Sequence, residues 1–189
     1  MDIILASNSP RRKELLKLLA EDFKIIPAKR EEKPDLSLPM GEMTENIAKS
    51  KALEVFAEHR DTIVIGADTM VFSDETPLGK PKDKKDAFRT LKSLSGRSHT
   101  VATGVAIVKE NYCDTFSTLT KVTFSKMTDE EIRWYIDTLE PMDKAGSYGI
   151  NGHGALFIEK IEGDFYSVVG LPVHELKKHL EICGFTCLN

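Results

Sequence analysis

The sequence predicts an α/β protein in which a mixed β-sheet, flanked by helices, is bent into two lobes around a cleft. Two observations predict this class. Short apolar runs alternate with helical patterns over the first half of the chain, as in strands that are joined by helices. The middle instead holds two long β-like runs, residues 99–109 and 114–125, and the second has the period of two of a half-buried antiparallel strand. We expect residues 1–189 to form a single domain.

Composition narrows the class of protein further. The chain has 189 residues, of which 41% are hydrophobic and 30% charged, with a net charge of −4. These values are typical of a globular protein and give no overall basic surface for a nucleic acid or a membrane. No run approaches the ~20 apolar residues of a membrane span, and the first apolar run is too short for a signal peptide. We therefore expect a cytoplasmic protein that binds neither nucleic acid nor membrane.

The chain starts with a short apolar run over residues 3–6, which is read as a buried strand. A polar turn with Ser7 and Ser9 and a helix that begins at Pro10 follow. The free N–H groups of a helix start and the two hydroxyls favour an anion over the turn. Arg11 and Arg12 lie in the first turn, where they oppose the helix dipole. The pattern therefore indicates a bound phosphate, and an ordinary capped helix with solvated arginines is the alternative.

The next segments are a short strand over residues 23–27 and a helix over residues 40–59. Between them, Glu31 and Glu32 are either metal ligands or part of a solvated charge run. Lys51 falls in the middle of the apolar face of the helix. Its ammonium group either extends out to solvent or meets a buried negative charge, and the sequence leans to the first alternative.

A buried strand over residues 62–67 is followed by Asp68 and Thr69. Strand ends are where ligands bind in open α/β sheets, so we interpret Asp68 as a metal ligand or general base rather than as a turn cap. A hairpin turn over residues 74–77 returns the chain to Lys80, which should then lie near Asp68. A plain surface lysine is the alternative.

The second half of the chain contains a helix capped by Asp83 and closed by Gly96, and a helix that opens with the capping box at residues 128–131. Residues 141–154 hold four glycines, which either let the backbone approach a ligand closely or form a plain loop. A strand over residues 155–161 and a last helix between Pro172 and Gly184 follow. The lone His99 is interpreted as structural, and the three cysteines as reduced thiols.

Five motifs together give a resemblance to a known family. They are LASNSPRR at residues 5–12, GADT at 66–69, GKP at 79–81, LSG at 94–96 and EPMDKAG at 140–146. With these motifs in this order, the chain resembles the Maf family of nucleotide pyrophosphatases nearly from end to end.

The resemblance implies a homodimeric cytoplasmic enzyme with the bent mixed sheet of the Maf and inosine-triphosphate pyrophosphatase fold. Such an enzyme hydrolyses a nucleoside triphosphate to the monophosphate and pyrophosphate with a divalent metal, Mg or Mn. The family has also been linked to arrest of cell division and septum formation. Its motifs correspond here to the phosphate-binding and catalytic residues Ser7, Arg11, Arg12, Glu31, Lys51, Asp68 and Lys80. We assign Asp68 as the base and, with Glu31, as a metal ligand.

Within the family, the branch that resembles dTTP/UTP pyrophosphatases carries an arginine after the proline, a threonine after the aspartate and a glutamine in the late glycine-rich motif. Arg11 and Thr69 match, whereas Asn151 stands where glutamine is usual. Asn151 keeps the amide for a pyrimidine edge but is one methylene shorter. The alternatives are a 7-methyl-GTP pyrophosphatase, whose branch lacks the first two features, and a nucleotide-binding regulator of cell division without turnover. Retention of both carboxylates and both lysines argues against the regulator.

Overall fold

The computed structural model describes residues 2–30 and 32–187. Its helices and strands, in chain order, are β1 (Ile3–Leu5), α1 (Pro10–Leu16), β2 (Lys24–Ile25), α2 (Met40–Phe56), β3 (Ile63–Ser73), β4 (Thr76–Leu78), α3 (Lys84–Leu94), β5 (Ser98–Lys109), β6 (Tyr112–Phe124), α4 (Asp129–Asp137), β7 (Ile158–Glu162), α5 (Phe165–Val169) and α6 (Val173–Ile182). Three 3₁₀ turns, η1 (Glu140–Asp143), η2 (Ala145–Ser147) and η3 (His153–Phe157), occupy the glycine-rich stretch. No helix among the described residues is long and apolar enough to cross a membrane.

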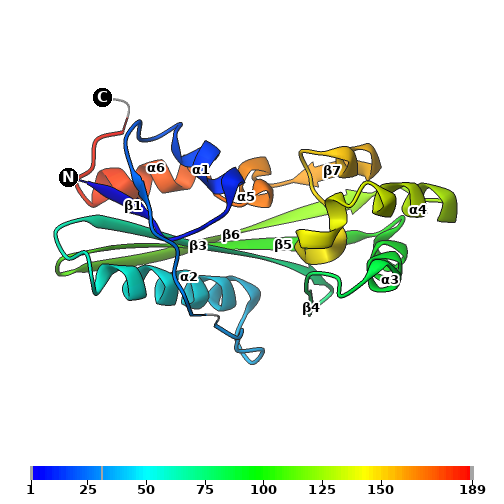
Figure 1. The fold of residues 1–189 in the computed structure, drawn as a ribbon, viewed down its shortest axis with the longest axis horizontal. Coiled ribbons are helices and arrows are strands. Elements are labelled where there is room, and N and C mark those ends of the chain that lie inside the picture. Colours follow the sequence, from blue (N-terminus) through cyan, green and yellow to red (C-terminus); the bar gives the residue numbers. More distant parts are fainter. Residues whose placement is uncertain (1, 31, 188–189) are drawn as a thin grey trace. The chain divides into compact units, whose positions relative to one another are not determined.

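The strands form one mixed sheet in the order β2-β1-β3-β5-β6-β7, with β4 paired to β3 (Figure 1). Strand β1 runs parallel to both β2 and β3, and Ile4 pairs with Lys24 on one side and Val64 on the other. The β3–β4 and β6–β7 pairs are antiparallel. The mixed α/β class that the sequence predicts is therefore confirmed.

The described residues divide into two compact units, which we call unit 1 and unit 2. Unit 1 lies within residues 1–69, 103–118 and 170–189, and unit 2 within residues 70–102 and 119–169. The cleft between two lobes and the single domain stay predictions.

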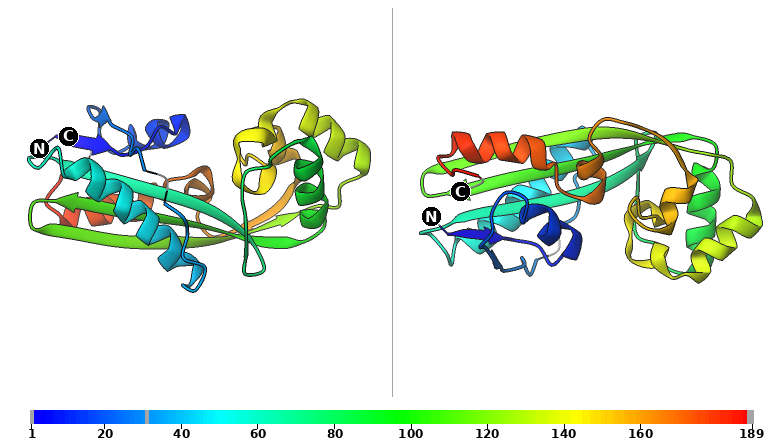
Figure 2. Two further views of the ribbon diagram at one scale, coloured as in Figure 1. Left: turned by 60° about the horizontal axis from the view of Figure 1, so that its bottom comes forward. Right: turned by 90° about the horizontal axis from the view of Figure 1, so that it is seen from above.

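In unit 1, helix α2 covers one face of the strands, and α1 and α6 lie on the other face (Figures 1 and 2). The contact of α2 with the strands is made of small and β-branched side chains, with a core cluster of Ile4, Ala6, Ala48, Ala52, Val55, Val64, Ala106 and Val108. An ideal Cβ built on Gly66 would lie 2.1 Å from the carbonyl oxygen of Ala48. Glycine at this position therefore lets α2 pack directly on β3.

In unit 2, helices α3 and α4 lie side by side (Figure 2) over a core that includes Leu91, Val101, Phe124, Ile132 and Tyr135. Both predicted helix starts are confirmed, because Asp83 caps α3 and the capping box of Thr128 and Glu131 opens α4. His99 is buried in this unit and its Nε2 lies 2.7 Å from the hydroxyl of Tyr148.

Two expectations about elements need correction. Asp68 lies inside β3 rather than after its end, because residues 70–73 continue the same extended backbone and pair with β4. The strand expected over residues 155–161 begins only at Ile158, since the chain forms the 3₁₀ turn η3 over His153–Phe157. The cysteines Cys113, Cys183 and Cys187 are all free.

Candidate active site

The start of α1 uses one of its two serines for its own capping. The Ser9 hydroxyl accepts a hydrogen bond from the backbone N–H of Arg12 at 3.4 Å, and Pro10 occupies the first turn. The Ser7 hydroxyl accepts from the backbone N–H of Ser9 at 3.2 Å, and Ser7 is buried. The ordinary helix cap is thus present. The solvated arginines expected with it are not found, because Arg11 and Arg12 are both half-buried.

The guanidinium group of Arg12 donates hydrogen bonds to three residues that lie apart in the chain. It donates from Nε to the carbonyl oxygen of Gly170 at 2.9 Å, from Nη1 to Ser7 Oγ at 3.2 Å and from Nη2 to Thr69 Oγ1 at 3.0 Å. Burial lowers the pKa of Arg12, and the nearby charge of Asp68 opposes this shift. An arginine remains protonated in such a setting. Three of its five N–H bonds are used, so two are left for a ligand.

Arg11 behaves differently from its neighbour. It is half-buried, and its guanidinium makes no hydrogen bond or ion pair with any described residue. The two arginines of the first turn therefore divide their roles: Arg12 organises the site, and Arg11 keeps its full set of donors.

Lys51 of α2 and Asp68 of β3 form an ion pair. Lys51 Nζ donates to Asp68 Oδ1 at 2.6 Å, and the two side chains are only 24% and 18% exposed. Lys51 thus meets a negative charge. The favoured expectation, that its ammonium group extends out to solvent, is wrong. The close packing of α2 at Gly66 explains the contact, since it brings this turn of the helix onto the strand. The other oxygen of Asp68 has no partner among the described residues.

Thr69 follows Asp68 on β3 and joins the Arg12 network to β5. Its hydroxyl lies 2.9 Å from the hydroxyl of Thr103, which is fully buried. Sequence reasoning missed both Thr103 and the Gly170 carbonyl. Gly170 has a φ of 133°, a conformation that favours glycine, and this isolated glycine after an apolar run was the only signal for it.

Five of the expected site residues are therefore brought together within unit 1. Hydrogen bonds link Ser7, Arg12 and Thr69, the ion pair links Lys51 to Asp68, and the chain joins Asp68 to Thr69. With Arg11 nearby in sequence, these side chains carry three positive charges and one negative charge. Such an excess of positive charge suits an anionic ligand.

The remaining expected residues are not placed in this network. Glu31 lies outside the described residues. Lys80 and Asn151 belong to unit 2, where both are exposed and neither makes a hydrogen bond or ion pair with a described residue. Their roles stay predictions.

No group of three or more His, Cys, Asp or Glu side chains that could hold a metal ion occurs within residues 2–30 and 32–187. In unit 1 the oxygen of Asp68 that does not pair with Lys51 is available for a cation. A cation shared between this oxygen and a bound phosphate fits the described residues, because Mg²⁺ is usually held by one or two carboxylates together with substrate phosphates.

Comparison with known proteins identifies the family to which the chain belongs. Residues 2–183 match the family model described as Maf-like protein. The chain belongs to the Maf family.

Curated Maf relatives resemble the chain over nearly its whole length. A dTTP/UTP pyrophosphatase of Bacillus velezensis is 51% identical over 179 residues, covering 95% of both chains. The dTTP/UTP pyrophosphatase of Aquifex aeolicus is 47% identical over 180 residues, covering 95% of this chain and 94% of its own. Among solved structures, the nucleoside-triphosphatase / dITP/XTP pyrophosphatase of Mycobacterium abscessus matches 67% of this chain and 76% of its own at 16% identity, with a TM-score of 0.44.

Proposed function

We propose that this Maf protein hydrolyses dTTP and UTP to the nucleoside monophosphate and pyrophosphate. The observation that carries the proposal is the partly buried Lys51–Asp68 pair, which holds one carboxylate oxygen at 2.6 Å and leaves the other without a partner among the described residues. Such a carboxylate, fixed beside an excess of positive charge, is suited to orient water next to a polyphosphate. The names of the relatives supply the nucleotides.

The cationic groups of unit 1 bind the triphosphate in this proposal. Arg11 contributes a guanidinium without partners among the described residues, and Arg12 contributes its two remaining N–H bonds. Arginine can grip phosphate oxygens in a bidentate manner, which orients the chain of phosphates as well as neutralising it. Ser7, which is held by Arg12, and Lys80 of unit 2 complete the expected phosphate contacts.

Asp68 acts as the base. Its available oxygen accepts a proton from a water molecule while the water oxygen bonds to the α-phosphorus. The bond between this phosphorus and the oxygen that bridges to the β-phosphorus breaks, and pyrophosphate leaves with that oxygen. Lys51 keeps the carboxylate in place, and Lys51 and Lys80 stabilise the negative charge on the leaving group.

A divalent cation, Mg or Mn, is part of the proposal. Asp68 and Glu31 would hold it, since Mg²⁺ is usually bound by one or two carboxylates together with substrate phosphates and water. When bound, the ion neutralises phosphate charge and polarises the α-phosphate.

Thr69 and Asn151 are the residues that we assign to base selection. Both can form hydrogen bonds with the polar edge of a pyrimidine. Asn151 replaces the usual glutamine, so substitution of Asn151 is the direct test of how the nucleotide is chosen.

Pyrophosphate release from dTTP, UTP, dUTP, CTP, GTP and 7-methyl-GTP tests the function, with Mg or Mn and with EDTA as the metal-free control. We expect dTTP and UTP to be hydrolysed fastest and EDTA to abolish the activity. Fastest hydrolysis of 7-methyl-GTP would instead place the chain in the other branch. Binding of UTP without any turnover would favour the regulator.

The homodimer implied by the family resemblance also belongs to the proposal. Sedimentation equilibrium at several protein concentrations tests it, and a mass of 21.1 kDa at all of them would contradict it.

A further inference from the structure

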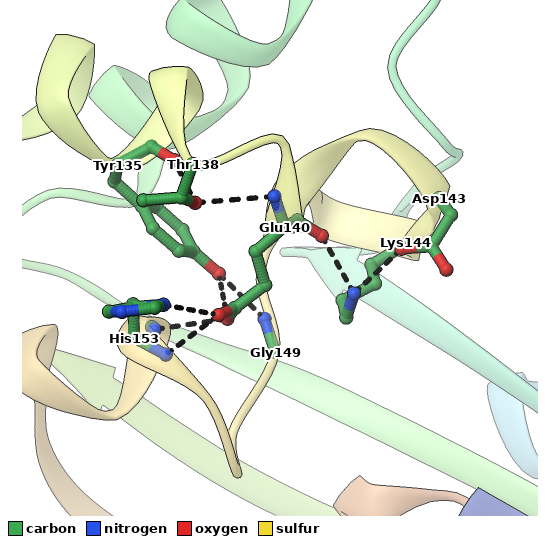
Figure 3. A network of polar contacts seen from close by, with 8 residues as sticks. Tyr135, Thr138, Glu140, Asp143, Lys144, Gly149 and His153 are labelled. Carbon is green, nitrogen blue, oxygen red and sulfur yellow. Dashed lines mark hydrogen bonds and ion pairs between the residues drawn. The ribbon is translucent and has the colours of Figure 1, made fainter. Parts of the chain in front are cut away.

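Unit 2 contains a polar network centred on Glu140, the first residue of η1 (Figure 3). Its carboxylate accepts from the Tyr135 hydroxyl at 2.8 Å, the backbone N–H of His153 at 2.8 Å, the His153 ring Nδ1 at 3.0 Å and the backbone N–H of Gly154 at 3.2 Å. Burial alone would raise the pKa of Glu140, but these hydrogen bonds outweigh it and hold the pKa below its usual value. The charged carboxylate is thus fully engaged inside the protein.

The same network also holds the other end of the glycine-rich loop. The buried Tyr135 hydroxyl accepts a hydrogen bond from the backbone N–H of Gly149 at 2.9 Å while it donates to Glu140 (Figure 3). Gly149 is therefore fixed at one end of the segment, and His153 and Gly154 at the other. Asn151 lies midway between these anchored residues.

The glycines of this loop make room for the anchor. A Cβ on Gly152 would lie 2.4 Å from Glu140 Oε2, and a Cβ on Gly154 would lie 2.4 Å from the Gly149 carbonyl oxygen and 2.6 Å from the Tyr135 hydroxyl. Real Cβ atoms do not approach other atoms this closely. The loop therefore wraps around the Glu140–Tyr135 pair so closely that only glycine fits, which neither sequence alternative for residues 141–154 foresaw.

Asn151 is the member of the loop that remains available to a ligand. It is exposed and makes no hydrogen bond with any described residue. An amide can discriminate between nucleobases only if its donor and acceptor are held in a defined place. Because Asn151 has one methylene less than the usual glutamine, its amide group extends less far from the backbone. The position of this amide group therefore depends more on where the backbone of the loop lies.

We propose that Glu140 is a positioning residue for base selection, because its carboxylate fixes the loop that presents the Asn151 amide to the pyrimidine. This inference rests on the proposed function and deepens it. Glu140 does not touch the nucleotide in this scheme. Its effect passes through the backbone of residues 149–154, and Tyr135 assists from the opposite end of the loop.

Hydrogen exchange of the amides of residues 149–154 tests the anchor without any reference to activity. Glu140→Gln keeps the shape of the side chain but replaces one carboxylate oxygen by an NH₂ group, which would face the backbone N–H of His153 or of Gly154. We therefore expect exchange in this loop to become at least about tenfold faster. Tyr135→Phe is the milder variant and should accelerate exchange of the Gly149 amide. Asp137→Asn is the matched control on α4, the helix that carries Tyr135. It breaks only the exposed Lys84–Asp137 pair and should leave exchange in the loop unchanged. Unchanged exchange in Glu140→Gln would overturn the proposal.

A double-mutant cycle with Asn151→Ala then tests base selection. The readout is the ratio of kcat/KM for UTP to that for CTP. We expect Glu140→Gln and Asn151→Ala each to lower this ratio by about tenfold, mainly through KM for UTP, and the double variant to lower it no further. Asp137→Asn should retain the wild-type ratio.

The outcomes separate this inference from the proposed function. A wild type that hydrolyses none of the nucleotides overturns the proposed function, and the base-selection role with it. An active wild type whose UTP/CTP ratio is unchanged by Glu140→Gln overturns only the positioning role. A double variant in which the effects of the two single substitutions multiply would also overturn the positioning role, because it would show that Glu140 does not act through Asn151.

Discussion

The polar networks of the two units differ in what they leave unused. In unit 1, Arg12 retains two N–H bonds, Asp68 retains one oxygen without a partner among the described residues, and the adjacent Arg11 has no described partner. In unit 2, four donors occupy the carboxylate of Glu140, which is about the number that such a group can accept. Spare hydrogen-bonding capacity next to uncompensated charge indicates a place for a ligand, whereas a saturated carboxylate indicates an anchor.

The largest expected effect comes from removing the spare oxygen of unit 1. Asp68→Asn keeps the shape of the side chain but cannot accept the proton of water, so kcat for UTP should fall by about 10³-fold. Glu140→Gln, in contrast, should leave kcat within a few fold. Steady-state pyrophosphate release measures both variants, and far-UV circular dichroism serves as the folding control. An Asp68→Asn enzyme with a tenth of the wild-type kcat would show that Asp68 is not the base.

The buried His99 of unit 2 makes stability depend on pH. Burial lowers the pKa of His99 to about 4, from 6.5 in the unfolded chain. Between these values the unfolded chain binds the proton more readily than the folded chain does. The contribution of His99 to the free energy of unfolding is therefore fully present above pH 6.5, and about 3 kcal/mol of it is lost as the pH falls to about 4.

Urea unfolding of the wild type and of His99→Asn across this pH range measures the effect. The variant lacks the titrating group, so its free energy of unfolding should fall less steeply with pH, and the difference between the two curves isolates His99. Parallel curves would contradict the assignment.

Substitution of the two arginines separates organisation from ligand binding. Arg12→Lys can keep only one of the three hydrogen bonds to Ser7, Thr69 and Gly170, so the free energy of unfolding should fall by about 2 kcal/mol. Arg11→Lys breaks no described contact and should change stability by less than about 0.5 kcal/mol. Equal losses in the two variants, measured by urea unfolding, would remove the distinction.

The smallest effect concerns two threonines whose hydroxyl groups are buried. Thr103→Val removes the hydroxyl that lies 2.9 Å from Thr69 and should cost about 1 kcal/mol of unfolding free energy. Thr118→Val is the matched control, because the Thr118 hydroxyl is buried and has no hydrogen-bond partner among the described residues. Its removal should be neutral or stabilising, and differential scanning calorimetry compares the two. A larger loss in Thr118→Val would contradict this ranking.

Much of the fold could be predicted because it depends on local signals. The helix starts at Pro10, Asp83 and Thr128 follow from capping chemistry, and β3, β5 and β6 follow from apolar runs and period-two alternation. Asp68 was predicted to follow its strand because the small residues before it resemble a strand end. The pairing of residues 71–73 with β4 instead keeps the chain extended through that point.

The sequence by itself determined the fold class, the order of the elements and the chemical types in the candidate site, since periodicity, caps and motifs are properties of neighbouring residues. Only the tertiary structure decided that Lys51 meets Asp68, that Arg12 holds Gly170 and Thr69, and that Glu140 anchors the loop of Asn151. The first two contacts join residues distant in the chain, and the third depends on how the loop folds back over Tyr135. Each depends on how closely backbones approach, as at Gly66 and Gly152, and this distance is set by packing rather than by local preference.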